Sequence, residues 1–145
     1  MADLNLLIHS AATLVMFGLI WFVQLVHYPL FNRVGRQSFP AYEIAHQART
    51  SVLVVPLMLV EALTAVSLLF VRPGVVPLAA AVAGVVLLAL VWVSTYLWQV
   101  PAHTRLSESF DVAVYRRLVL TNWVRTIGWT LRGILVCSMM HSAWM

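Results

Sequence analysis

Residues 77–100, PLAAAVAGVVLLALVWVSTYLWQV, contain no Asp, Glu, Lys or Arg, and they decide the class of protein. An α-helix needs about 20 consecutive apolar residues to cross the hydrocarbon core of a bilayer. The whole chain has the same character: 62% of its 145 residues are hydrophobic, 10% are charged, and the mean hydropathy is +0.91. Because soluble domains are roughly half apolar and a quarter charged, the composition predicts a membrane protein.

Four apolar runs of this kind fill the chain. We expect membrane spans at about residues 4–30, 51–71, 77–100 and 118–140, with the second helix extended back to about residue 38, where Ser-Phe-Pro resembles a helix start. The short connection after the second span favours antiparallel neighbours. The sequence therefore predicts a single transmembrane domain over residues 1–145. Its expected fold is all-α, an antiparallel up-down-up-down four-helix bundle.

The arginines predict the orientation of this bundle. The chain has no lysine, and most of its arginines lie in the loop between the first two spans and the loop between the last two. These loop residues are Arg33, Arg36, Arg49, Arg105, Arg116 and Arg117, against Arg72 alone on the opposite side. Short loops rich in arginine mark the cytoplasmic side. We therefore expect a multi-pass protein of the bacterial inner membrane, with both termini on the outer, periplasmic side. The arginines do not gather on one soluble face, so no nucleic-acid partner is predicted.

Each predicted span carries its polar residues on one helical face. Polar side chains are costly in lipid and normally face the bundle interior, so we expect the four stripes to meet. Those at the cytoplasmic end are Gln24, His27, His46, Arg49, Gln99, His103 and Asn122. Their common depth predicts one polar site near the cytoplasmic face. Alternatively, the histidines are interfacial, the amides join helices by hydrogen bonds, and Arg49 extends to the lipid phosphates.

Three histidines in this set suggest a metal ion. Neutral imidazole binds zinc, iron and copper, and three histidines form an open catalytic site, so we predict His27, His46 and His103 as ligands of one of these metals. The motif Glu43-Ile-Ala-His46 occurs once and Glu43 is expected in the cytoplasmic rim, which argues against a di-iron carboxylate site. Residues predicted to bind the cofactor are Gln24, Gln99, Asn122, Arg49 and Trp129.

Charged residues also occur at greater depth. By helical rise, Glu61 lies about 15 Å deeper than Ser51, and Arg125 about 10 Å inside Leu118. We expect Glu61 and Arg125 to pair, with Arg132 as the alternative partner, and we predict Glu61, Arg125 and His27 as catalytic residues. Arginine beside tryptophan suits a carboxylate, phenolate or quinone-like ligand, although the charges could instead form a structural ion pair. His9 is expected to be solvated near the outer surface.

Several stretches in order along the chain carry a family resemblance. These are VQLVHYPLF (23–31), FPAYEIAHQART (39–50), PLMLVE (56–61), QVPAH (99–103) and RRLVLTNWVRTIGWTLRG (116–133). Together they resemble a group of small bacterial four-helix membrane proteins of unknown function. The layout, with His-Tyr-Pro closing the first span, is also similar to the anthrone-oxygenase-like membrane domain. That second resemblance implies redox chemistry on polycyclic phenolic substrates.

We therefore favour an intramembrane enzyme, a metal- or cofactor-dependent oxidoreductase that acts on a hydrophobic small molecule. His27, His46 and His103 would hold the metal or transfer protons, and Glu61 would accept a proton beside Arg125. One alternative is a small proton-coupled transporter or proton relay, for which a homo-oligomer could supply the missing symmetry. Another is a non-catalytic membrane subunit whose polar residues only specify helix packing.

Overall fold

The computed structural model describes residues 1–145 and contains helices and no strand. Its elements are α1 (Ala2–Phe22), η1 (Val23–His27), α2 (Tyr28–Phe31), α3 (Phe39–Leu68), α4 (Leu78–Ser94), η2 (Thr95–Gln99), α5 (Val100–Glu108) and α6 (Val112–Trp144). Because α1, η1 and α2 follow one another without a break, as do α4, η2 and α5, the chain forms four long helices. This confirms the predicted all-α class.

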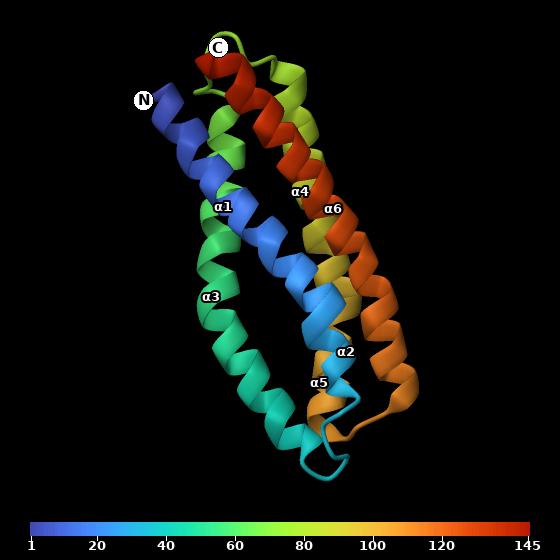
Figure 1. The fold of residues 1–145 in the computed structure, drawn as a ribbon. Helices are drawn as coiled ribbons and strands as arrows, with labels where there is room; N and C mark the ends of the chain where they lie inside the picture. The colour runs from blue at the N-terminus through green and yellow to red at the C-terminus, as the bar shows by residue number, and fades with distance from the viewer.

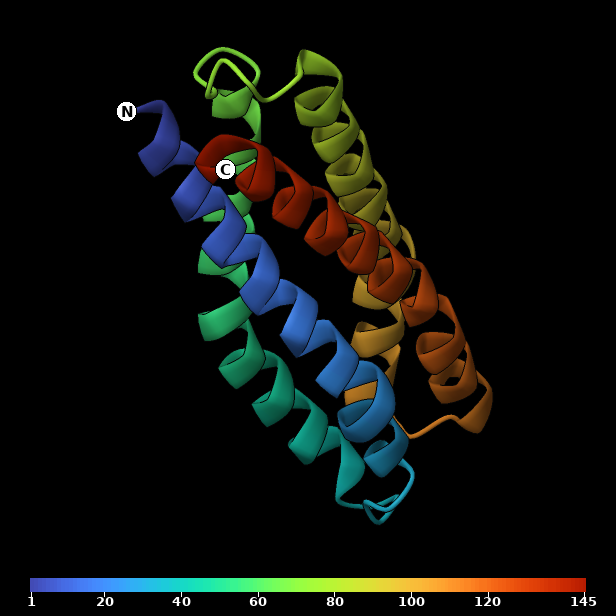
Figure 2. The ribbon, with the colours of Figure 1, turned by 45° about the horizontal axis from the view of Figure 1, so that its top comes forward.

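The four long helices lie side by side along one axis (Figure 1). Both termini and the α3–α4 connection lie at one end of the molecule, which we call the terminal end. The α2–α3 and α5–α6 connections lie at the opposite end, which we call the loop end. α1 packs against both α3 and α6, and α4 packs against α6. The turned view in Figure 2 shows the same arrangement.

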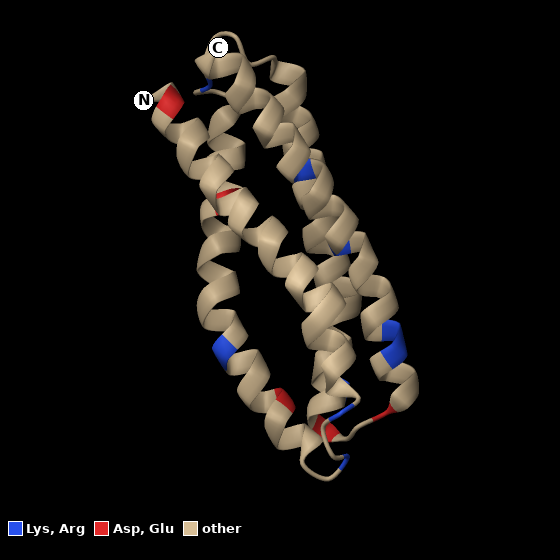
Figure 3. Cartoon of the chain, in the orientation of Figure 1, with Lys and Arg blue, Asp and Glu red and all other residues tan.

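Three of the long helices are long and apolar enough to cross a membrane: Ala2–Phe31, Phe39–Leu68 and Leu78–Glu108. The fourth predicted span, residues 118–140, lies within α6, which is as long but carries Arg125 and Arg132 along its length. Figure 3 shows that charged residues are sparse along the middle of the bundle. Large apolar side chains of α6 point outward, with Leu120 71% and Ile134 64% exposed.

The helix starts follow local capping chemistry. α3 begins at Phe39 with Pro40 in its first turn, where the missing backbone donor costs nothing. This agrees with the expected start near residue 38. α6 begins after Asp111, whose Oδ1 accepts hydrogen bonds from the backbone N–H groups of Ala113 at 2.7 Å and Val114 at 3.2 Å.

Two π-helical turns widen the first and third long helices toward the loop end. They are η1 and η2, and each is followed by one residue and then a proline, Pro29 or Pro101. Proline lacks a backbone donor and clashes with the preceding turn of an α-helix, so a wider turn accommodates it. The helices continue through these prolines to Phe31, close to the expected end of the first span, and to Glu108, beyond the expected end of the third span near residue 100. Such π-turns are frequent at functional sites.

Two apolar clusters flank the part of the bundle that contains η1 and η2. At the loop end, Tyr28, Phe31, Phe39, Ala102, Leu106 and Leu118 form a buried cluster. Further toward the terminal end, a second buried cluster contains Met16, Ile20, Met58, Val91 and Trp129. The two clusters restrict access of water to the groups between them, where a charge or hydrogen bond acts more strongly than it would in water.

Candidate functional site

The best-defined group of potential metal ligands joins α3 and α5. Glu43 and His46 are three residues apart, so α3 presents both on one face, and α5 brings His103 against them. One ligand atom from each of the three residues lies within 4.8 Å of the other two. Glu43 Oε1 is 2.5 Å from His103 Nδ1, and the Glu43 side chain is fully buried. We call Glu43, His46 and His103 the His/Glu centre.

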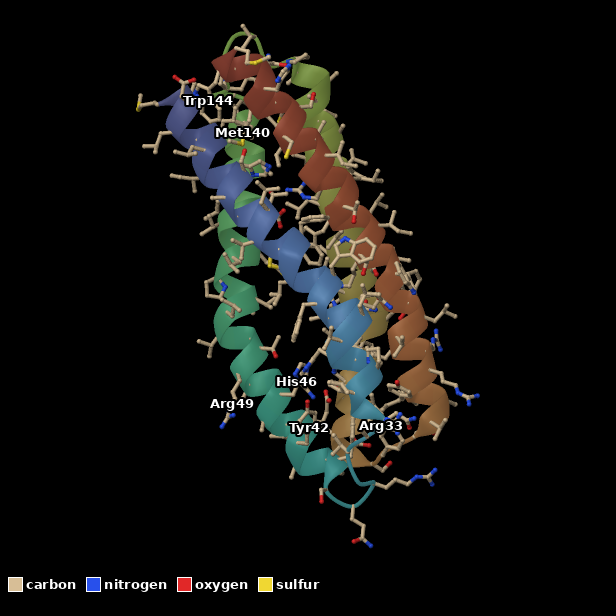
Figure 4. All side chains as sticks on the ribbon, in the orientation of Figure 1. Arg33, Tyr42, His46, Arg49, Met140 and Trp144 are labelled. Atoms are coloured by element: carbon tan, nitrogen blue, oxygen red, sulfur yellow. The ribbon has the colours of Figure 1, made fainter.

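Neighbouring polar groups orient the His/Glu centre. His27 Nε2 lies 2.9 Å from His46 Nδ1, and the Tyr28 hydroxyl lies 2.9 Å from His103 Nε2. Gln47 Nε2 donates to Glu43 Oε1 at 3.1 Å. Figure 4 shows His46 on the inner side of α3, whereas Arg49 extends outward from the same helix. Hydrogen bonds of this kind fix ring orientation and tautomer in metal sites.

The chemistry of the His/Glu centre fits a metal ion. Glu43 Oε2 is buried and has no hydrogen-bond partner, which is costly for a carboxylate oxygen unless a cation satisfies it. Both hydrogen bonds of the His46 ring use Nδ1, so Nε2 remains free to coordinate. One carboxylate and two imidazoles suit zinc or copper, and they are also the donor set of non-haem iron sites. The centre could therefore hold a metal once the ion replaces the proton between His103 Nδ1 and Glu43 Oε1, because Nε2 of that ring is hydrogen-bonded to the Tyr28 hydroxyl.

Two of the three predicted metal ligands, His46 and His103, belong to this centre. His27 lies one step away, against His46, and Glu43 takes the third place in the group. Glu43, which we expected in the cytoplasmic rim, lies near the start of α3 with a fully buried side chain. The Glu-x-x-His spacing was the signal that could have identified it.

A second polar cluster links η1 to α6. Gln24 Oε1 accepts hydrogen bonds from Asn122 Nδ2 at 2.9 Å and Thr126 Oγ1 at 3.3 Å, and Arg125 Nη1 donates to Asn122 Oδ1 at 3.1 Å. The structure thus brings together Gln24, Asn122 and Arg125. Gln99 lies apart from them and donates to Thr121 Oγ1 at 3.0 Å.

Glu61 forms its ion pair with Arg132. Arg132 Nε donates to Glu61 Oε1 at 2.9 Å, and the indole N–H of Trp129 donates to Oε2 at 3.0 Å. The expected pairing of Glu61 with Arg125 is therefore wrong, and the alternative partner is the correct one. Both arginines lie on one stripe of α6, two turns apart, so the helical period alone does not distinguish them.

His9 belongs to the same buried region as this ion pair. It is 2% exposed, and its Nδ1 lies 2.9 Å from Thr64 Oγ1. The expectation of a solvated His9 is wrong, because α1 turns this residue toward α3. The polar face predicted for the first span does include His9. Its position near the end of the helix, however, did not indicate that the side chain is buried.

A cavity of about 240 Å³ lies between these polar groups. Its polar lining includes His46, Gln47, Thr50, Tyr28, Gln99, His103 and Arg125, and its apolar lining includes Met16, Ile20, Val54 and Met58. The cavity therefore connects ligands of the His/Glu centre with Arg125 across an apolar space. Of the other predicted residues, Arg49 is exposed, and Trp129 is buried against Arg125 with 5.3 Å from Cζ to the ring centroid.

No family model, curated protein or solved structure matches this chain. A fold hosts many chemistries, and function must be argued from the site itself. The site combines three features: the His/Glu centre, the buried Arg125, and an apolar cavity. His46 and His103 of the centre line this cavity, and so does Arg125.

Proposed function

We propose that the chain is a multi-pass protein of the bacterial inner membrane, an antiparallel up-down-up-down bundle with both termini on the outer side. Three helices with the length and apolar character of membrane spans support insertion. Arg33 and Arg36 lie in the 32–38 connection, and Arg105, Arg116 and Arg117 lie on the helices that flank the 109–111 connection. Both connections share the loop end, while both termini share the other (Figure 1). This distribution supports a cytoplasmic loop end.

The proposed activity is that of an intramembrane oxidoreductase with a metal at the His/Glu centre. The observation that carries this proposal is the buried Glu43 carboxylate, which faces two histidines with one oxygen left without a partner. Bound iron or copper would supply the one-electron chemistry that protein side chains lack. The resemblance to the anthrone-oxygenase-like domain also favours oxidation of an apolar molecule.

The residues around the centre have defined tasks in this proposal. Tyr28 and Gln47 hold His103 and Glu43 in orientation through the hydrogen bonds described above. His27 shares a proton with Nδ1 of His46, which keeps Nε2 of that ring free. The apolar cluster beside the site lowers the local polarity, and this strengthens charge interactions there. A proton relay has less support, because no hydrogen bond joins this centre to the Glu61–Arg132 pair.

Metal analysis of the detergent-purified protein tests this proposal. We expect about one iron or copper ion per chain, and its loss in both Glu43→Gln and His103→Ala variants. The matched control is His141→Ala, an exposed histidine at the other end of the bundle, which should retain the metal. Helicity measured by circular dichroism identifies variants that fold. Metal content that is unchanged in both folded site variants would rule out the His/Glu centre.

A further inference from the structure

Arg125 is a buried cation without an anionic partner. It is 8% exposed, and the two ion pairs in the structure join Glu61 to Arg132 and Glu43 to His103. A buried charge is costly when it is unpaired. Arg125 also lines the 240 Å³ cavity, so an anion bound there could reach it.

The free edge of the Arg125 guanidinium has the geometry that suits a carboxylate. Nη1 donates to Asn122 Oδ1, and Asn122 is itself held by Gln24. Nε is buried and has no hydrogen-bond partner, and the Tyr28 hydroxyl, which lines the same cavity, is a neutral hydrogen-bond partner of the guanidinium. Nε–H and Nη2–H together form the planar fork that binds a carboxylate through two parallel hydrogen bonds. The ring of Trp129 lies against the same guanidinium and supports its orientation.

The rest of the cavity suits an apolar body. Met16, Ile20 and Met58 line it and are buried. Val55 of α3 and Val100 of α5 also line it but are 49% and 50% exposed, so the cavity opens between these helices on the lateral surface of the bundle. In the proposed membrane this opening faces lipid. The volume is below the ~300 Å³ at which common ligand pockets begin, which restricts the occupant to a small molecule.

We propose that this cavity binds a small apolar monocarboxylate. Its carboxylate accepts hydrogen bonds from Nε and Nη2 of Arg125, and its apolar body lies along Met16, Ile20 and Met58. His46 and His103 line the same cavity, so the bound molecule lies beside the His/Glu centre. Its role as the substrate rests on the proposed oxidoreductase function, whereas its binding does not.

Calorimetric titration of the full chain in lipid nanodiscs tests the binding. Two probes differ in the apolar body, decanoate and 2-naphthoate, and each is compared with its neutral amide. Empty nanodiscs correct for partition into lipid. We expect at least one carboxylate to bind tenfold more tightly than its amide, about 1.4 kcal/mol. The better probe shows whether the cavity takes an aliphatic or an aromatic body.

Substitutions in α6 test whether Arg125 causes the preference for a carboxylate over its amide. Arg125→Gln should reduce the preference for carboxylate over amide to less than twofold, and Arg125→Lys, which keeps the charge without the fork, should reduce it at least threefold. Arg116→Gln, an exposed position of α6, should leave it unchanged. Helicity by circular dichroism shows which of the two Arg125 variants folds, and either one suffices.

The outcome separates this inference from the proposed function. The inference is overturned if neither probe is preferred over its amide, or if a folded Arg125 variant keeps the full preference. The titration is repeated after treatment with a chelator. Carboxylate binding in a protein that never holds a metal would remove the proposed function and leave this inference intact, while metal binding without carboxylate binding would do the reverse.

Discussion

Replacing Glu61 with leucine should lower the free energy of unfolding by about 3–5 kcal/mol, the range found when one partner of a buried ion pair is removed. The carboxylate is fully buried and accepts three hydrogen bonds: from Arg132 Nε at 2.9 Å, Thr13 Oγ1 at 2.9 Å and Trp129 Nε1 at 3.0 Å. Its removal leaves Arg132, which is 1% exposed, with the Gly84 carbonyl and His9 as its remaining contacts.

A second substitution shows whether the cost arises from the stranded charge. Adding Arg132→Leu to Glu61→Leu should recover about 1–3 kcal/mol, because contacting residues are coupled by such amounts and an apolar pair needs no partner. Unfolding by a denaturing detergent, followed by circular dichroism, measures both steps. Glu108→Gln, an exposed carboxylate of α5, should change stability by less than about 0.5 kcal/mol. A loss below about 1 kcal/mol for Glu61→Leu, or strictly additive losses in the double variant, would refute this reasoning.

Three further predictions concern packing, capping and orientation. Gly128→Ala should lower stability by about 1–3 kcal/mol, because its Cβ would lie 2.5 Å from Cγ2 of Val91. Adding Val91→Ala should restore most of the thermal midpoint, and Gly18→Ala, with no neighbour within 4 Å, is the control; an unchanged midpoint for Gly128→Ala would contradict the close approach. Asp111→Ala should cost about 1 kcal/mol through loss of the α6 cap, and equal denaturation midpoints would show that the cap is dispensable. Alkaline phosphatase fused to either terminus should be active and β-galactosidase inactive, and the opposite pattern would reverse the proposed orientation.

The helical fold was accessible from the sequence because one physical signal dominates it. Long apolar runs predict helices of membrane length, and their polar stripes predict inward faces. Hydropathy does not show where a helix ends, however, because α3 begins before its apolar part and α5 continues to Glu108 beyond it. Glu43 lies in the first of these extensions, where His103 of α5 packs against it and its side chain is fully buried.

The sequence predicted only part of the site's membership, since it included His46 and His103 but not Glu43, and it did not predict how the polar residues pair. The helical period placed Gln24 on the polar face of the first span and Asn122 on that of the fourth. In the structure the two side chains form a hydrogen bond of 2.9 Å. The period cannot choose between Arg125 and Arg132 as the partner of Glu61, since the choice depends on how α1, α3 and α6 slide along one another. That sliding is set by side-chain packing, as at Gly128, and packing is not encoded in periodicity.

The two π-helical turns make the number of residues in the chain as important as their identity. A π-turn holds an additional residue, and in an α-helix each residue turns the chain by about 100°. Deleting one residue from η1 would leave a hydrophobic helix of nearly the same length and composition. It would nevertheless rotate His9 and Thr13 away from α3, or His27 and Tyr28 away from the His/Glu centre. The same applies to η2, which holds His103 in phase with α4. A single-residue deletion would therefore leave the length and apolar character of the helix almost unchanged and would disrupt the polar interior.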